Sequence, residues 1–136
     1  MRVFSNMTEV FRGLRVLVVE DELLMRWSIA ETLAQAGHRV IEAADGATAL
    51  LAVKDNVEAL DAIVLDYRLP DSNDLALLTA IRGLTPESPV VLMTAFGTDE
   101  ISQAALNLGV YRVLDKPFEM PDLESLLREA CSSRPH

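Results

Sequence analysis

The sequence has a single cysteine, few basic residues and no long hydrophobic run. Cys131 has no second cysteine in the chain with which to form a disulfide, which favours a reducing compartment, the cytoplasm. Lys and Arg number 12 against 21 Asp and Glu, and the net charge of −9 argues against direct nucleic-acid binding, which needs a basic face. No apolar run approaches the roughly 18 residues of a membrane span. Neither nucleic acid nor a membrane is therefore an expected partner.

The chain does have enough apolar residues for a core. Half of its 136 residues are hydrophobic, which argues against disorder, and the length predicts one domain. We expect that domain over residues 14–131, with an N-terminal extension over 1–13 and a C-terminal tail over 132–136.

Short apolar runs alternate with segments of helical periodicity along this domain. We predict strands at about 15–19, 38–43, 62–65, 89–93 and 110–114, each followed by a helix. This alternation predicts an α/β fold in which a doubly wound, five-stranded parallel sheet carries helices on both faces. The residues expected to face inward on the first two helices are Leu23, Trp27, Ala30 and Ala34, then Ala47, Leu50 and Leu51.

Charged residues stand where three of the predicted strands end: Glu20 and Asp21, then Asp66, then Lys116. Because the carboxyl ends of parallel strands meet at one edge of a sheet, we expect these side chains to converge. Converging carboxylates repel one another unless a cation or a proton lies between them. Ligands that are all oxygen suit Mg²⁺, with Mn²⁺ as an alternative ion. A metal, a carboxylate and an ammonium group together equip this edge to receive a phosphoryl group.

Four segments, each at the end of its own predicted strand, resemble the receiver domain of two-component response regulators. They are Val-Val-Glu-Asp-Glu at 18–22, Leu-Asp-Tyr-Arg-Leu-Pro at 65–70, Met-Thr-Ala at 93–95 and Lys-Pro-Phe at 116–118. The resemblance extends over about residues 14–130. It implies the flavodoxin-like strand order 2-1-3-4-5, which makes the first and third strands neighbours and brings Asp21 opposite Asp66.

The resemblance also implies how the phosphoryl group is handled. Asp66 is the expected phosphoacceptor, whose carboxylate attacks a phosphohistidine on a partner protein. Thr94 and Lys116 are expected to bind the phosphoryl oxygens after transfer, with lysine acting as a compact point charge. The bond between Lys116 and Pro117 is expected to be cis.

A metal site follows from the same resemblance. Asp21 and Asp66 are expected to bind Mg²⁺ directly, together with the backbone carbonyl of Arg68. Glu20 is expected to contribute through a water molecule, and an alternative role for Glu20 is to cap the helix that follows.

Two positions depart from the receiver pattern. Receivers usually have an aromatic switch residue three positions before the lysine, where this chain has Val113. Tyr111 and Phe96 are the nearby aromatic candidates for a switch that works with Thr94. The second departure is Asp74, where receivers often have glycine and where an aspartate could instead cap the next helix. We therefore expect phosphorylation to be retained even if signalling differs.

We expect a phosphorylatable switch, not an enzyme beyond its own phosphorylation and dephosphorylation. The expected donor is a sensor histidine kinase or a phosphotransfer protein. The expected output is a population shift that changes binding to a downstream protein or formation of a homodimer, through the surface formed by 98–109, 110–114 and 121–130. The chain is either a stand-alone receiver, which the short tail slightly favours, or a domain of a longer regulator.

Three other interpretations fit the sequence less well. A phosphatase of the aspartate-nucleophile type needs an acid/base aspartate two residues after the nucleophile, where this chain has Arg68. A dinucleotide oxidoreductase needs a Gly-x-Gly-x-x-Gly motif after the first strand, which is missing. A pseudo-receiver, which binds a partner without phosphorylation, is supported only by Val113 and Asp74.

Overall fold

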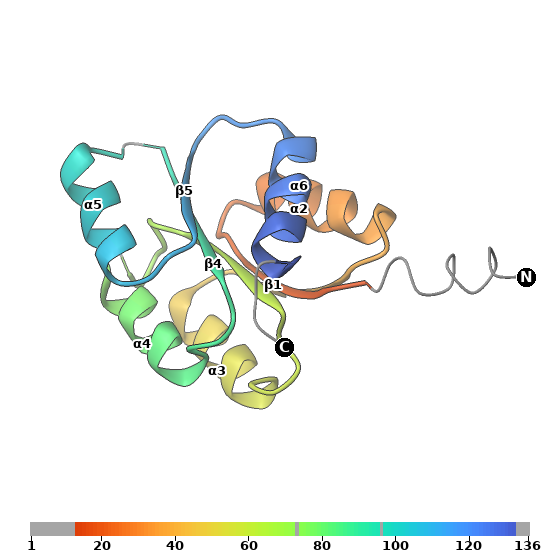
Figure 1. The fold of residues 1–136 in the computed structure, drawn as a ribbon, viewed down its shortest axis with the longest axis horizontal. Helices are drawn as coiled ribbons and strands as arrows, with labels where there is room; N and C mark the ends of the chain where they lie inside the picture. The colour runs from red at the N-terminus through yellow and green to blue at the C-terminus, as the bar shows by residue number, and fades with distance from the viewer. Residues whose placement is uncertain (1–12, 73, 96, 133–136) are drawn as a thin grey trace, which may run out of the picture.

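A parallel sheet forms the centre of the computed structural model, which describes residues 13–72, 74–95 and 97–132 (Figure 1). Over these residues the strands are β1 (Arg15–Val19), β2 (Arg39–Ala43), β3 (Ala62–Asp66), β4 (Val90–Thr94) and β5 (Arg112–Asp115). Their order is β2-β1-β3-β4-β5, as the resemblance implies, and every pairing is parallel. The predicted strand boundaries differ from these by at most two residues.

Helices cover both faces of the sheet (Figure 1). They are α2 (Leu23–Gln35), α3 (Gly46–Asp55), α4 (Ala76–Leu84), α5 (Asp99–Asn107) and α6 (Met120–Ser132). Helices α2 and α6 lie together on one face, and α3, α4 and α5 lie on the other. Within the described residues, no helix is both long and apolar enough to cross a membrane.

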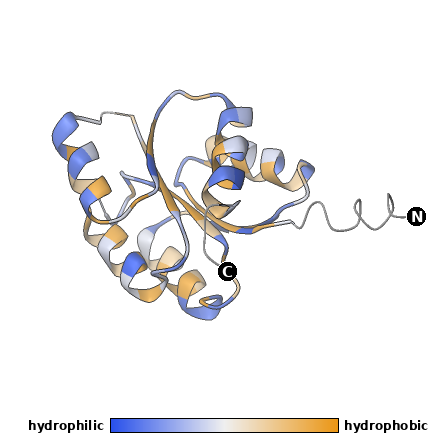
Figure 2. Ribbon diagram, viewed as in Figure 1, coloured by the Kyte–Doolittle hydropathy of each residue, from blue (hydrophilic) through white to orange (hydrophobic). Residues whose placement is uncertain are grey.

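Each central strand is buried on both of its faces. Along β1, Val16 and Val18 pack toward α2 and α6, whereas Leu17 and Val19 pack toward α3 and α4. Parallel strands covered on both sides have continuous apolar runs instead of alternating ones, which is why these strands could be predicted. Figure 2 shows the result as a hydrophobic sheet with hydrophilic residues on the outer sides of the helices.

Of the four residues predicted to face inward on α2, Ala30 is buried, whereas the prediction is wrong for Leu23, Trp27 and Ala34. Leu23 and Trp27 are 65% and 58% exposed, and the residues that α2 buries are Ile29, Ala30 and Leu33. The reason is that apolar residues occur around the whole first half of this helix, so their spacing alone is compatible with more than one buried face. The packing of Ile29 and Leu33 into the core beside α6 selects the face.

The inward face predicted for α3 is wrong for Ala47 and Leu51, whereas Leu50 packs against the core. Ala49 and Val53 are fully buried, whereas Ala47 is exposed, Leu51 is 62% exposed and Leu50 is half-buried. Small side chains let α3 lie close to the sheet, so that the two larger leucines fall at its edge and on its outer side. Size at the contact therefore outweighs hydrophobicity in choosing the face of this helix.

Candidate functional site

Glu20, Asp21 and Asp66 come together at the edge of the sheet where β1 and β3 end. One carboxylate oxygen from each lies within 4.8 Å of the other two. The strands pair so that Val19 is opposite Leu65, which brings the residues that follow to the same edge. The side chains of Glu20 and Asp66 are buried, and that of Asp21 is exposed.

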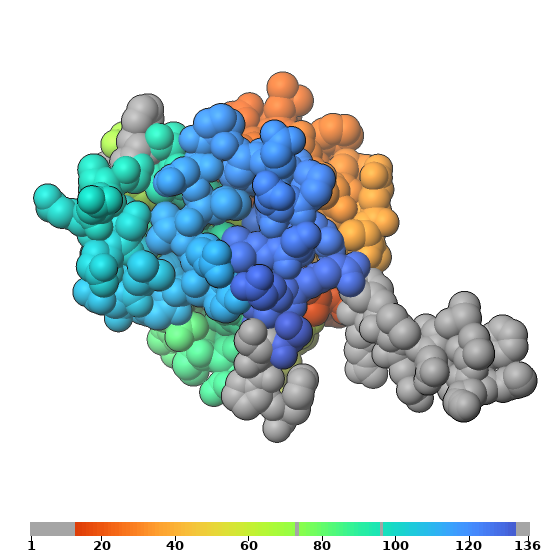
Figure 3. Space-filling view, turned by 45° about the horizontal axis from the view of Figure 1, so that its top comes forward, coloured from red at the N-terminus to blue at the C-terminus, as the bar shows by residue number. Residues whose placement is uncertain are grey.

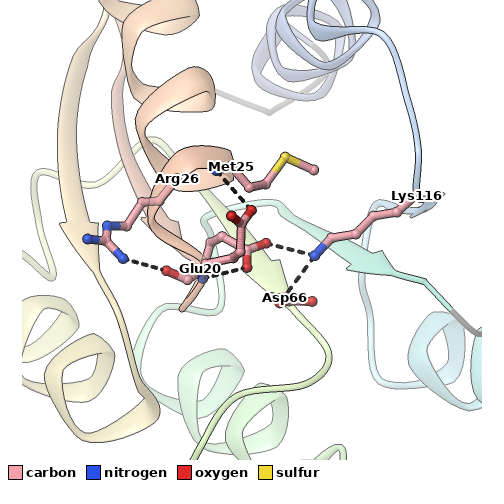
Figure 4. A network of polar contacts seen from close by, with 6 residues as sticks. Glu20, Met25, Arg26, Asp66 and Lys116 are labelled. Atoms are coloured by element: carbon pink, nitrogen blue, oxygen red, sulfur yellow. Dashed lines mark hydrogen bonds and ion pairs between the residues drawn. The ribbon is translucent and has the colours of Figure 1, made fainter.

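Lys116 reaches this cluster from the end of β5, as Figure 4 shows. Its ammonium nitrogen lies 2.8 Å from Oε1 of Glu20 and 3.3 Å from Oδ2 of Asp66. Its backbone N–H donates to the carbonyl of Thr94 at 2.9 Å, which holds β5 beside β4 at this point. The bond between Lys116 and Pro117 is cis, as the resemblance implies.

Burial and charge set the ionisation of the two ion-pair partners. Burial, followed by repulsion from Glu20, raises the pKa of Asp66 to about 6, although Lys116 opposes the rise. Burial would lower the pKa of Lys116, but its hydrogen bond to Glu20 and the charges of Asp66 and Glu20 raise that pKa overall. The carboxylates are thus crowded beyond what one ammonium group compensates, which is a local charge balance that a bound cation would improve.

A cavity of about 340 Å³ opens over the cluster. Residues 20–22 form one side, the consecutive residues 66–70 form another, and Thr94, Ala95 and Lys116 complete the lining. Arg68 is therefore at the cavity, as expected, and its side chain is exposed. Three carboxylates beside an open, water-accessible cavity fit Mg²⁺, which takes one or two protein carboxylates and keeps several waters.

Glu20 does not cap α2, so that alternative is wrong. The cap is Glu22, whose carboxylate accepts the backbone N–H of Met25 at 3.1 Å. Glu20 instead accepts the N–H of Glu22 at 3.0 Å through Oε2, which leaves Oε1 for Lys116. The side chain of Glu20 is thereby directed into the cavity.

Arg26 is a supporting residue that the sequence analysis missed. Its guanidinium donates to the backbone carbonyl of Glu20 at 2.9 Å (Figure 4). The same guanidinium forms an ion pair with Glu42 at 3.0 Å. Arg26 therefore ties α2 and β2 to the turn that carries the acidic residues. Its position one turn into a predicted helix gave no signal of this role, because the contact is to a backbone atom.

Thr94 is buried at the end of β4 and lines the cavity. A Cβ atom at Gly97 would lie only 2.7 Å from Cγ2 of Thr94, so this close approach of the loop requires glycine. Val113 is partly buried and packs against the core on the side of α3 and α4.

Tyr111 contacts α6 and its own neighbour Arg112. Its hydroxyl donates to Glu129 on α6, and its ring lies 5.5 Å from the guanidinium of Arg112. Tyr111 immediately precedes β5. The segments α5, β5 and α6 lie side by side on the face that Figure 3 shows. The other aromatic candidate, Phe96, lies outside the described residues.

Asp74 does not adopt the left-handed backbone that glycine would favour, since none of the described residues other than glycine has a positive φ. Its Oδ1 accepts the N–H of Ala76 at 2.9 Å, at the start of α4. The aspartate thus contributes a hydrogen bond to this helix end, although the residue at the cap position itself is Leu75.

Comparisons with known proteins agree with this geometry. The family model described as the response regulator receiver domain matches residues 16–128. The chain is 39% identical over 118 residues to the transcriptional regulatory protein TcrA of Mycobacterium tuberculosis, covering 85% of this chain and 45% of TcrA. It is 33% identical over 121 residues to the DNA-binding transcriptional regulator NtrC of Escherichia coli, covering 89% of this chain and 25% of NtrC. The chain thus spans less than half the length of these curated relatives.

Solved structures show the same likeness. The receiver domain of NtrX from Brucella abortus has a TM-score of 0.78 at 34% identity, covering 87% of this chain and 98% of that one. A CheY-like response regulator receiver domain protein from Methanospirillum hungatei has a TM-score of 0.82 at 26% identity, covering 89% and 95%.

Proposed function

The chain belongs to the receiver-domain family of two-component response regulators, and on that basis we propose that Asp66 accepts a phosphoryl group in a Mg²⁺-dependent reaction. The donor is a phosphohistidine on a sensor histidine kinase or a phosphotransfer protein. The observation that carries this proposal is the buried Asp66 carboxylate, which lies 3.3 Å from the ammonium of Lys116 and within 4.8 Å of two further carboxylates. The proposed receiver spans residues 14–131, between an extension at 1–13 and a tail at 132–136, and its proposed compartment is the cytoplasm.

The proposed metal ligands are Asp21, Asp66 and the backbone carbonyl of Arg68, with Glu20 acting through water. When bound, the ion supplies positive charge that offsets the phosphoryl oxygens and the carboxylates in the transition state. The chain's own contribution is position: β1 and β3 hold the carboxylates at one edge, and Arg26 fixes the backbone of Glu20.

The proposed transfer requires an ionised Asp66. A pKa of about 6 leaves its carboxylate mostly ionised at neutral pH, so that one oxygen can attack phosphorus while the bond to the donor's imidazole breaks. Lys116 is close enough to Asp66 to meet the new negative charge on the phosphoryl oxygens. Thr94, at the end of the neighbouring strand, is the proposed hydroxyl donor to the same group.

The proposed output surface is the one formed by α5, β5 and α6, through which the phosphorylated form would bind a downstream protein or a second copy of the chain. Support comes from connectivity, since Thr94 ends β4, Lys116 directly follows the neighbouring strand β5, and β5 contacts α5. A phosphatase is less well supported, because the position two residues after Asp66 is Arg68, which cannot act as a general acid at neutral pH.

The decisive experiment is phosphorylation by acetyl phosphate, followed by intact-mass measurement. We expect one phosphoryl adduct in the presence of Mg²⁺, none with a chelator and none for Asp66→Asn. Asp115→Asn is the matched control, because it removes an exposed carboxylate next to Lys116 and is expected to keep the adduct. An unlabelled wild-type protein would favour the pseudo-receiver, and an adduct retained in Asp66→Asn would refute the assignment of the acceptor.

A further inference from the structure

Asp71 lies in the loop between β3 and α4 and binds the beginning of α3, a helix far from it in sequence. Its Oδ1 accepts the N–H of Gly46 at 2.7 Å, and its Oδ2 accepts the N–H of Ala47 at 3.0 Å. One carboxylate therefore holds the first two amides of α3.

Helix α3 already has a cap of its own. Asp45 precedes the helix and accepts the N–H of Thr48 at 2.8 Å, an arrangement that lowers the pKa of Asp45. A helix start leaves four N–H groups without partners inside the helix, so Asp71 satisfies donors that Asp45 does not reach. The approach is close, since a Cβ atom at Gly46 would lie 3.1 Å from Oδ1 of Asp71.

The loop that carries Asp71 is also a wall of the site. Residues 66–70 line the cavity without interruption. At the inner end of this wall, the N–H of Tyr67 donates to Met93 on β4 at 2.8 Å. At its outer end, Leu69 and Ser72 exchange backbone hydrogen bonds of 2.7 and 3.2 Å around a tight turn.

The tight turn has two attachments to the rest of the molecule. The side chain of Leu69 is buried in the core, and Asp71, in the middle of the turn, is bonded to α3. Arg68 stands between the attachment at Tyr67 and this turn, so the location of its backbone depends on both.

We propose that Asp71 is a positioning residue for the metal and phosphoryl site, which acts by clamping the 66–70 wall to α3. This inference rests on the proposed function, since it concerns how the wall presents Arg68 to the ion. Without the clamp, the wall samples more conformations, and binding must then restrict them at a cost in affinity. Asp66 and Thr94, which end their strands, and Lys116, which directly follows β5, keep their places. The variant should therefore lose Mg²⁺ affinity more than phosphorylation rate at saturating Mg²⁺.

The test compares Asp71→Ala with Asp45→Ala, because both remove one carboxylate from the start of the same helix. Calorimetric titration with Mg²⁺ gives the affinity, and urea unfolding with a chelator gives the stability. We expect both variants to unfold at a similarly lowered urea concentration, because each loses a cap at the same helix start. Only Asp71→Ala should weaken Mg²⁺ binding, by roughly tenfold as for other residues that support metal ligands. Asp71→Asn keeps one acceptor oxygen and should restore part of the affinity.

A second readout is the acetyl phosphate labelling rate as a function of Mg²⁺ concentration. For Asp71→Ala we expect the half-saturating Mg²⁺ concentration to rise, with a nearly unchanged rate at saturation. A pure charge effect would instead weaken both alanine variants alike and would shrink as salt screens it.

Two results would overturn the positioning role of Asp71. One is a wild-type Mg²⁺ affinity in Asp71→Ala, and the other is a loss of Mg²⁺ affinity in Asp45→Ala equal to that in Asp71→Ala. In either case a wild-type protein that binds Mg²⁺ and forms the adduct leaves the proposed function standing. A wild-type protein that does neither refutes both proposals together.

Discussion

At the scale of single residues, the notable feature is a buried carboxylate beside another of the same charge. Asp66 and Glu20 share one ammonium group, that of Lys116, at distances of 3.3 and 2.8 Å. A structure selected for stability alone would not bury both carboxylates, because removing a charge from water is costly unless it is fully paired. Burial of both carboxylates should therefore lower the stability of the metal-free protein, a cost that the proposed binding of a cation would offset.

Asp66→Asn should therefore stabilise the metal-free protein at neutral pH. The folded-state pKa of about 6 lies above the ordinary 3.8, so the native state binds more protons between these values, and wild-type stability falls as pH rises through that window. Asparagine cannot ionise. The free energy of unfolding of the variant at pH 7.5 should therefore exceed that of wild type by on the order of 1–3 kcal/mol. At a pH below about 4 this advantage should disappear.

Urea unfolding with a chelator, at several pH values, measures this difference. Excess Mg²⁺ should reduce the advantage of the variant, because the ion stabilises only a protein that can bind it. A variant that is less stable than wild type at pH 7.5 without metal would contradict the charge argument.

The residue types of the site could be predicted because each follows an apolar strand and matches a receiver motif. The closer approach of Lys116 to Glu20 could not be predicted, because the carboxylates of Glu20 and Asp66 both lie within reach of its ammonium group. The same holds for Arg26, whose bond to a backbone carbonyl leaves no mark in the sequence.

At the scale of elements, α2 shows how an apolar helix chooses its buried face. Leu23 is 65% exposed, and Leu33, in the same helix, is fully buried. Strand positions were easier to predict than helix faces, because both faces of the central strands are buried and no face has to be chosen. Helix faces depend on the neighbours that each helix meets.

Leu23→Ala and Leu33→Ala form a matched pair that tests the observed face. Leu33→Ala should lower the free energy of unfolding by about 2–5 kcal/mol, because it leaves a cavity in the core. Leu23→Ala should change the free energy of unfolding by no more than roughly 0.5 kcal/mol. Thermal or urea unfolding of the two variants measures the costs. A larger cost at Leu23 would favour the face predicted from sequence spacing.

At the scale of the whole molecule, His38 joins three segments that are distant in sequence. Its buried ring accepts the N–H of Leu14, before β1, at 3.0 Å through Nδ1. Its Nε2 lies 2.8 Å from the carboxylate of Glu124 on α6. Because Nδ1 is an acceptor here, we assign the proton to Nε2, which donates to Glu124. The end of the sheet opposite the candidate site is thereby tied to α6.

Glu124→Ala should destabilise the protein by about 1–3 kcal/mol, because it leaves the N–H of His38 without this acceptor. Burial of Glu124 favours its neutral form, but the hydrogen bonds from His38 and Arg128 outweigh it and lower the pKa of Glu124. Its stabilising effect should accordingly be full above the ordinary pKa of 4.5 and fade as pH falls through the lowered value.

Urea unfolding across pH measures this effect, with Glu129→Ala as the control on the same helix. Glu129 is 56% exposed and pairs with Arg112, so its removal should cost less than about 1 kcal/mol. Equal losses in the two variants would refute a structural role for the His38–Glu124 contact.

The sequence by itself determined the strands, the family and the candidate site residues. The physical reason is that a doubly covered parallel sheet demands continuous apolar runs, and the residues that follow those runs must converge at one edge. Tertiary structure decided which helix faces are buried, which carboxylate Lys116 approaches most closely and where Asp71 binds. These outcomes depend on side-chain size and on partners far away in the chain, and such contacts exist only after the layers have packed.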